Sequence, residues 1–222
     1  MSRRCFRDPI PEIFRAAELL DNAASAHLAG DTAIAARLIS QADNPVIRAW
    51  TESIWGRRDP SIHVICDQLQ PLPHVALAER PRPRMPDATT RAQILARDGL
   101  HCRFCGIPVI PVEARQFLNR AYPEAARWGR RNVDQHAALQ CMWLQFDHLI
   151  PNERGGTSDL ENVIVTCAPC NFGRMQFTIE EAGLDNPLSA PLSATWSRFG
   201  TWDGLARLLD SPNQRNRPLG ST

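Results

Sequence analysis

Two Cys-x-x-Cys pairs constrain this 222-residue chain more than any other feature of its sequence. The first pair is Cys102 and Cys105, with Gly106 directly behind it, and the second is Cys167 and Cys170. The chain has 7 cysteines, an odd number, and pairs at this spacing more often bind a metal than form disulfides. Four thiolates complete the tetrahedral shell of Zn²⁺ and leave no position for water. We therefore expect one structural zinc site that joins two distant segments.

The composition is that of a globular chain without a membrane span. Hydrophobic residues make up 43% and charged residues 22%, which excludes a disordered chain. The longest apolar runs are far shorter than the roughly 20 residues that cross a bilayer. The basic N-terminus lacks the apolar segment of a secretory signal. We therefore expect a cytoplasmic protein with no membrane association.

Arginines cluster in the middle of the sequence. All 25 basic residues are Arg, and between Arg80 and Arg131 there are 11 of them against 4 acidic residues. A GC-rich genome explains the choice of Arg over Lys, but it does not explain the clustering. A basic segment favours a polyanionic partner, and we expect that partner to be a nucleic acid. The residues expected to contact it are Arg115, Arg120, Arg127, Arg130 and Arg131.

Three amphipathic helices are predicted in the first sixty residues. Apolar side chains recur near the 3.6-residue period after Pro11, over 32–39 and after Pro45, and Gly56 ends the third segment. Pro suits the first position of a helix. The apolar faces of these helices must be buried on something. A homodimer or protein partner that docks through them is therefore a hypothesis.

A proline-rich stretch separates these helices from the rest of the chain. Prolines recur over residues 57–88, and the run Arg-Pro-Arg-Pro-Arg-Met-Pro is incompatible with a helix. We interpret the stretch as a linker that contains one strand or short helix at 61–68. Thr90 and Gln93 fit a capping box that opens a short helix through Ala96.

The remaining elements follow from local composition. Helices are predicted over 112–119 and 123–128, a strand over 139–146, a helix continuation or turn over 179–184, and a last short helix over 202–209. The domain organisation is then a helical region and linker (1–85), a second domain (86–185) with a helical insertion at about 107–139, and a C-terminal extension (186–222) with a disordered tail.

The stretch from Phe146 to Arg174 resembles the HNH endonuclease family. It contains an Asp-His pair, a Gly-Gly loop, an Asn before a β-branched run, and a Cys-x-x-Cys pair followed by Asn. The resemblance spans about residues 89–178. It implies an α+β fold, in which a ββα-metal (HNH) nuclease core is clamped by zinc knuckles. An N-terminal all-α region would be added to that core.

The resemblance also implies roles for single residues. His148 would be the general base, since an imidazole takes a proton from water near neutral pH. Asp147 and Asn171 would hold one catalytic Mg²⁺ or Mn²⁺, and Asn162 would hold the loop and the base in place. Arg174 lies one helical turn after Asn171 and would bind the scissile phosphate or the charge of the transition state.

Two functions of different classes follow. The first is a metal-dependent HNH endonuclease that hydrolyses DNA phosphodiester bonds, by analogy in restriction or anti-phage defence. The alternative is a catalytically inactive, zinc-stabilised nucleic-acid-binding module, or the effector subunit of a larger complex. A decayed domain tends to lose a motif residue, and none is missing here, which favours the enzyme.

Overall fold

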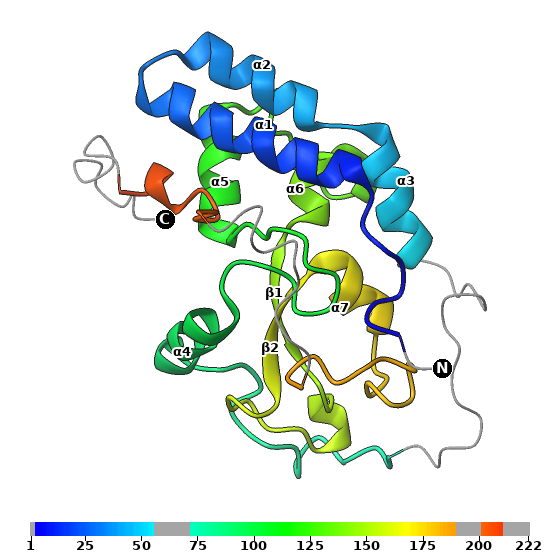
Figure 1. The fold of residues 1–222 in the computed structure, drawn as a ribbon. Coiled ribbons are helices and arrows are strands. Elements are labelled where there is room, and N and C mark those ends of the chain that lie inside the picture. Colours follow the sequence, from blue (N-terminus) through cyan, green and yellow to red (C-terminus); the bar gives the residue numbers. More distant parts are fainter. Residues whose placement is uncertain (1–2, 56–71, 190–200, 211–222) are drawn as a thin grey trace.

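The computed structural model describes residues 3–55, 72–189 and 201–210 (Figure 1). The expected element at 61–68 and the expected disordered tail lie outside these ranges. Among the described residues, no helix has the length and apolar character needed to cross a membrane. In chain order the elements are α1 (Pro11–Leu28), α2 (Thr32–Ala42), α3 (Pro45–Ile54), α4 (Ala88–Asp98), α5 (Val112–Ala121), α6 (Ala137–Cys141), β1 (Leu144–His148), β2 (Val163–Cys167) and α7 (Ala168–Arg174), with short 3-10 turns at Asn132–Asp134, Asn152–Arg154 and Ala206–Leu208.

The three predicted N-terminal helices are present and form a layer over the rest of the molecule (Figure 1). α1 and α2 pack along each other, and α3 continues from α2 toward α7. α1 and α3 begin with Pro, and the Asn44 side chain caps α3 by accepting the Val46 N–H at 2.9 Å. Ile13, Leu20 and Ile39 are completely buried in the core that this layer shares with the other elements.

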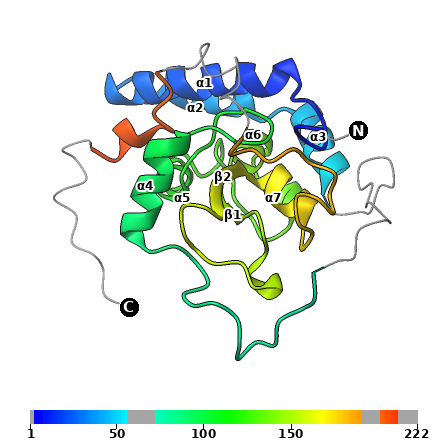
Figure 2. The same ribbon diagram turned by 60° about the horizontal axis from the view of Figure 1, so that its bottom comes forward.

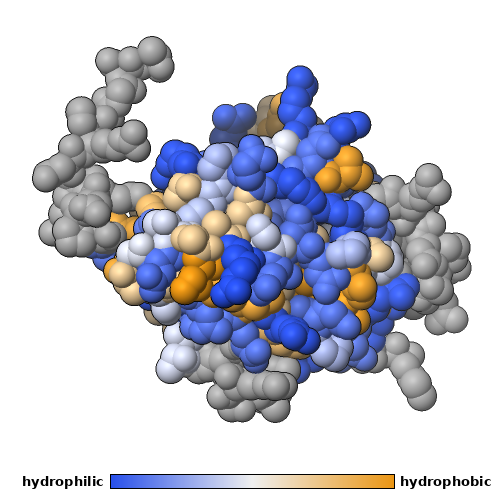
Figure 3. All heavy atoms as spheres, turned by 90° about the horizontal axis from the view of Figure 1, so that it is seen from above, coloured by the Kyte–Doolittle hydropathy of each residue, from blue (hydrophilic) through white to orange (hydrophobic). Residues whose placement is uncertain are grey.

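The apolar side of this layer is covered by the chain itself, through the segment expected as an insertion. The imidazole Nε2 of His136 lies 2.8 Å from the carbonyl oxygen of Ile39. The Asp43 carboxylate accepts the Ala137 N–H at 2.7 Å and pairs with Arg127 at 2.7 Å. The outer face is mainly hydrophilic, with scattered apolar side chains (Figure 3). A partner that docks on this layer stays a prediction.

Two predictions between residues 123 and 146 differ from the structure. Residues 123–126 form a turn, in which the Ala126 carbonyl accepts a bond from the Asn119 side chain, and Trp128 pairs with Gln135 across the segment. The strand expected from residue 139 begins at Leu144, after the short helix α6. The residues of α6 are all buried, and a fully buried apolar run shows no periodicity that distinguishes helix from strand.

The start of α4 and the length of the last helix also differ from the expectation. α4 begins at Ala88, and the Asp87 carboxylate caps it by accepting the Thr90 N–H at 2.7 Å, so Thr90 lies inside the first turn. The expected last helix is only the 3-10 turn Ala206–Leu208. Residues 179–183 form a turn, which is one of the two forms expected there. The Asp87 side chain caps a helix in the same way as the Thr90 side chain was expected to do, so the sequence alone allowed a helix start at either residue.

The strands β1 and β2 form a two-stranded antiparallel sheet, with Asp147 opposite Ile164 and His148 opposite Val163. A sheet of this size is marginal by itself. α7 packs against both strands. The outer edge of β2 is also covered, because the Val165 N–H donates to the Asp98 carboxylate at 2.9 Å and its carbonyl accepts the Arg103 N–H at 2.9 Å. The end of α4 therefore closes the free edge of the sheet.

Replacement of Asp98 tests this edge contact. The Asp98 side chain is fully buried and also accepts two bonds from Arg97, at 2.7 Å each. Asp98→Ala leaves buried donors without their acceptor, and we expect the free energy of unfolding to fall by about 3–5 kcal/mol. Urea unfolding followed by tryptophan fluorescence measures it. Asp87→Ala, which removes only the exposed cap of the same helix, should cost clearly less. Equal losses would contradict the edge role of Asp98.

Candidate active site and metal centre

The four predicted ligand cysteines come together in one buried group. Their Sγ atoms all lie within 4.8 Å of one another, and those of Cys105 and Cys167 are 3.7 Å apart. Metal–sulfur bonds of about 2.3 Å in a tetrahedron place sulfurs about 3.8 Å apart. Burial raises the pKa of the Cys167 thiol well above its ordinary value, and a bound cation would offset this cost of forming the thiolate. The geometry fits a four-cysteine metal site with no open position.

Each cysteine pair is shaped by its own local structure. In the first knuckle the Gly106 N–H donates to the Cys102 carbonyl at 2.8 Å, and Gly106 has a φ of +79°, which favours glycine. In the second, Cys167 ends β2 and Cys170 lies in the first turn of α7. His101 is buried beside the first knuckle but outside the four-cysteine group. Burial lowers the pKa of His101 to about 4, so the imidazole is neutral.

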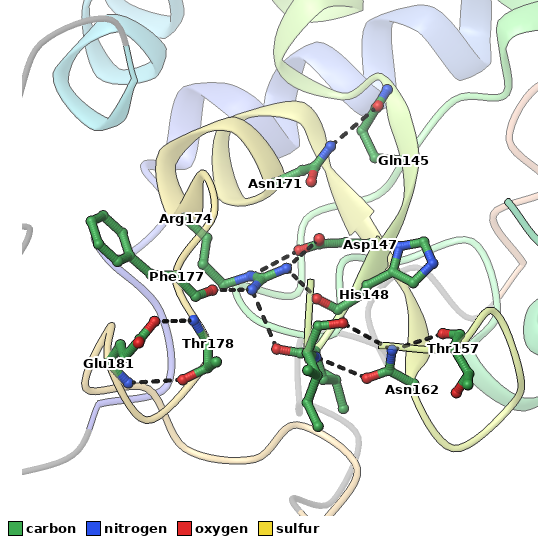
Figure 4. A network of polar contacts seen from close by, with 12 residues as sticks. Gln145, Asp147, His148, Thr157, Asn162, Asn171, Arg174, Phe177, Thr178 and Glu181 are labelled. Atoms are coloured by element: carbon green, nitrogen blue, oxygen red, sulfur yellow. Dashed lines mark hydrogen bonds and ion pairs between the residues drawn. The ribbon is translucent and has the colours of Figure 1, made fainter. Parts of the chain in front are cut away.

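The next part of the site is the contact between β1 and α7 (Figure 4). Alternate residues of a strand point to one face, and Gln145 and Asp147 both meet α7. The Asn171 amide nitrogen donates to the Gln145 side-chain oxygen at 3.3 Å. The Arg174 Nε donates to one Asp147 carboxylate oxygen at 3.1 Å, and its Nη2 pairs with the other. Asp147 on β1 and Asn171 on α7, the two expected metal ligands, therefore both lie where α7 packs against β1.

Arg174 is placed differently from the sequence expectation. Its side chain is only 1% exposed. Besides Asp147, it donates to the carbonyl oxygens of His148, Leu149 and Phe177. Burial raises the pKa of Asp147, and the Arg174 guanidinium acts against that rise. The guanidinium thus ties α7 to the end of β1 and is not presented to solvent as a phosphate ligand.

Asn162 closes the loop between the two strands. Its side-chain oxygen accepts the Ile150 N–H at 2.8 Å, and its amide nitrogen donates to the carbonyls of Ile150 at 3.0 Å and Thr157 at 2.7 Å. A Cβ atom at Gly156 would lie 1.7 Å from the Ile150 carbonyl oxygen, so only glycine fits there. Asn162 fixes the backbone just beyond His148 and does not reach the cleft lining.

His148 is anchored through a residue that the sequence did not reveal. Its Nε2 lies 2.9 Å from the Ser158 Oγ, and that hydroxyl donates to the Pro83 carbonyl at 2.9 Å. A hydroxyl has one proton, so the serine must accept from His148, and Nδ1 keeps the free lone pair. Burial lowers the pKa of His148, and the nearby Arg174 and Arg84 lower it further. The imidazole is therefore neutral at neutral pH, as a general base requires.

A cleft of about 510 Å³ brings the expected catalytic residues together. It is lined by parts of β1, α7, the loop after β1 and residues 80–85, a segment that the sequence analysis assigned to a linker. Nothing in the proline pattern distinguishes such a wall from a linker. The lining includes Asp147, His148, Asn171 and Arg174, together with Arg80 and Arg84.

The five arginines expected to contact DNA do not line this cleft. Arg115 is buried, and its guanidinium stacks 3.7 Å from the centre of the Trp128 ring, so it is not presented to solvent for the expected contact with DNA. The exposed Arg131 pairs with Asp134 at 2.7 Å. Arg120, in the last turn of α5, and Arg130 are exposed. Their contact with nucleic acid stays a prediction.

The cysteine group predicts a selective loss of metal. Purified protein should carry about one tightly bound metal ion per chain, measured by elemental mass spectrometry. Cys167→Ser removes a ligand and should lower both the metal content and the unfolding temperature. Cys141→Ser is the matched control, because Cys141 is buried outside the group. Unchanged metal content in Cys167→Ser would exclude the site.

The burial of Arg174 predicts a loss of stability. Arg174→Ala leaves the Asp147 carboxylate buried and unpaired, which should reduce the free energy of unfolding by about 3–5 kcal/mol. Arg130→Ala, which removes an exposed arginine, should change it little. Urea unfolding compares the two variants. Full stability together with weaker DNA binding in Arg174→Ala would instead favour the phosphate role expected from sequence.

Comparison with known proteins adds the family. No curated protein and no solved structure matches the chain. The family model that matches is described as HNH endonuclease, and it covers residues 131–174. That range runs from the end of the inserted segment through β1, the Asn162 loop and β2 to Arg174 at the end of α7. Together with the four-cysteine group that clamps it, this match identifies residues 131–174 as an HNH endonuclease domain within a larger mixed helical and β-stranded chain.

Proposed function

We propose that the protein is a metal-dependent endonuclease that hydrolyses DNA phosphodiester bonds. One observation carries the proposal: a neutral, anchored histidine lines the same cleft as a carboxylate and an amide. His148 is 9% exposed, so it reaches solvent while its position is held. Hydrolysis of a phosphodiester requires an activated water and positive charge near the phosphate.

His148 supplies the base. Since Nε2 is committed to Ser158, Nδ1 is the atom that accepts the proton from an attacking water. The strand backbone is held by Arg174 at the His148 carbonyl and by Asn162 just beyond it. These contacts limit the motion of the ring, and a fixed geometry lowers the entropic part of the barrier.

Asp147 and Asn171 are the residues that would hold a catalytic Mg²⁺ or Mn²⁺. The Asn171 amide nitrogen is used by Gln145, which leaves its oxygen for a ligand. Each Asp147 oxygen accepts one N–H from Arg174 and keeps a further lone pair. Oxygen donors of this kind suit hard divalent ions. When bound, the ion would stabilise charge on the phosphate and the leaving oxygen.

The cysteine group has a separate, structural role. We assign zinc to it, because four thiolates form a closed tetrahedral site that excludes water and substrate. Residues Cys102 and Cys105 follow α4, whereas Cys167 and Cys170 join β2 to α7. Zinc would therefore fasten the segment that closes the sheet edge to the helix that carries Asn171.

One observation favours the alternative of an inactive nucleic-acid-binding module. Both Asp147 oxygens are paired with the Arg174 guanidinium, and this positive charge competes with a divalent ion for the carboxylate. If that competition prevents cation binding, the fold and the basic cleft remain while catalysis is lost. A role in restriction or anti-phage defence rests on analogy with other HNH proteins.

A plasmid assay separates the two functions. Wild-type protein with Mg²⁺ or Mn²⁺ should nick or linearise supercoiled DNA, and His148→Ala should slow this by about 10²–10⁴-fold. The divalent ion is left out in the negative control, because a chelator would also remove zinc. Arg37→Ala removes an exposed side chain of α2 and should cut normally.

Two outcomes would contradict this proposal. Normal cleavage by His148→Ala would exclude it as the base. Wild-type protein that binds DNA and keeps its zinc but does not cut with either ion would support the inactive binding module. Zinc content and circular dichroism check that each variant is folded.

A further inference from the structure

The segment assigned to a linker forms a wall of the cleft. We call residues 72–86 the strap; it runs below the loop that follows β1 in both ribbon views (Figures 1 and 2). The Val75 N–H donates to the Glu153 carbonyl at 2.8 Å, and the Asn152 side chain donates to the Pro81 carbonyl at 2.9 Å. Ser158 adds its bond to the Pro83 carbonyl. Hydrogen bonds at Val75, Pro81 and Pro83 therefore hold the strap against the loop between β1 and β2.

The charge of the strap faces the reaction site. Arg80 and Arg84 line the cleft that contains His148, and Arg80, Arg82 and Arg84 line an adjoining hollow of about 620 Å³. Arg84 is exposed and forms no ion pair with any residue that the structure describes. Of the two acids in the cleft lining, Asp147 is already neutralised by Arg174. The second acid is Glu153, so the lining has three arginines against two acids and a net charge of +1.

The cleft also exposes flat and flexible apolar side chains. Phe172 on α7 is 42% exposed, Met175 is 54% exposed and Met85 on the strap is 40% exposed, and all three line the cleft. Exposed arginines beside exposed apolar groups match a ligand that carries phosphates and bases. The prolines of the strap restrict its backbone, so less conformational entropy is lost when a ligand binds.

We propose that Arg82 and Arg84, together with Arg80, hold phosphates of a nucleic-acid strand that lies between the strap and α7. The strap is then the substrate-binding wall of the site. This inference rests on the proposed function, because it places the same strand beside His148. The main phosphate contacts would then come from the Arg-Pro run of the strap and not from residues 107–139, as the sequence had led us to expect.

Binding measured without cleavage tests the proposal. The probes are a fluorescein-labelled DNA duplex and its single strand, bound by His148→Ala protein and followed by anisotropy over a series of salt concentrations. Arg84→Gln should weaken duplex binding roughly five- to tenfold near 0.1 M salt, and the salt slope should fall by about 0.9 for each lost phosphate contact. Arg82→Gln should behave alike. Arg84→Lys retains the charge and should recover most of the affinity.

The matched control is Arg37→Gln, which removes an exposed arginine of α2 and should leave binding unchanged. Arg84→Gln and Arg82→Gln proteins that bind like this control would overturn the proposal, as would a protein that binds neither probe. If Arg120→Gln and Arg130→Gln were the weakened variants, the inserted segment would be the binding surface.

The plasmid assay keeps the two proposals apart. A wild-type protein that cuts DNA while Arg82 and Arg84 prove irrelevant would retain the nuclease and exclude the strap. A wild-type protein that fails to cut, but whose DNA binding depends on Arg84, would retain the strap and exclude the nuclease.

Discussion

The guanidinium of Arg174 holds the end of β1 against α7, and the geometry of the site depends on that contact. A buried charge is tolerated only when it is paired and its donors are satisfied. Here Asp147 takes two donors, and the carbonyls of His148, Leu149 and Phe177 take the others. The contact fixes Asp147 on the side of Asn171 while the His148 ring points away from Arg174 (Figure 4). One buried arginine thus helps to position both the expected metal ligand Asp147 and the expected base His148.

The same contact bears on the divalent ion expected at Asp147. A cation held there would share its carboxylate with Arg174, and the two positive charges would repel each other. Its binding should then depend on the phosphate of the substrate, which adds negative charge between them. In the inactive alternative, the charge of the phosphate is not enough to let a cation bind at Asp147. If a cation binds at Asp147 despite the ion pair, the protein is an enzyme with substrate-dependent metal binding. If none binds, the protein is a binding module.

Stability of the core requires more than this one contact. The sheet has two strands and α7 has 7 residues, and elements of this size bury little apolar surface by themselves. The four-cysteine group, the Asp98 carboxylate on the edge of β2 and the N-terminal helix layer each add contacts from distant parts of the chain. The helix layer thus helps to stabilise the sheet and α7, and α6 lies between them, in contact with α1, α3 and α7.

The sequence by itself determined the features that local spacing encodes. Two Cys-x-x-Cys pairs define a tetrahedral thiolate set wherever they meet, and the 3.6-residue period with its Pro starts located α1, α2 and α3. The order of Asp147, His148, Asn162 and Asn171 marked one site because the strands and helix between them are short. Only the tertiary structure decided which charged side chains are exposed. Arg174 and Arg115 are buried, Ser158 anchors His148, and the Arg-Pro run lines the cleft, because each depends on groups that pack against it from distant parts of the chain.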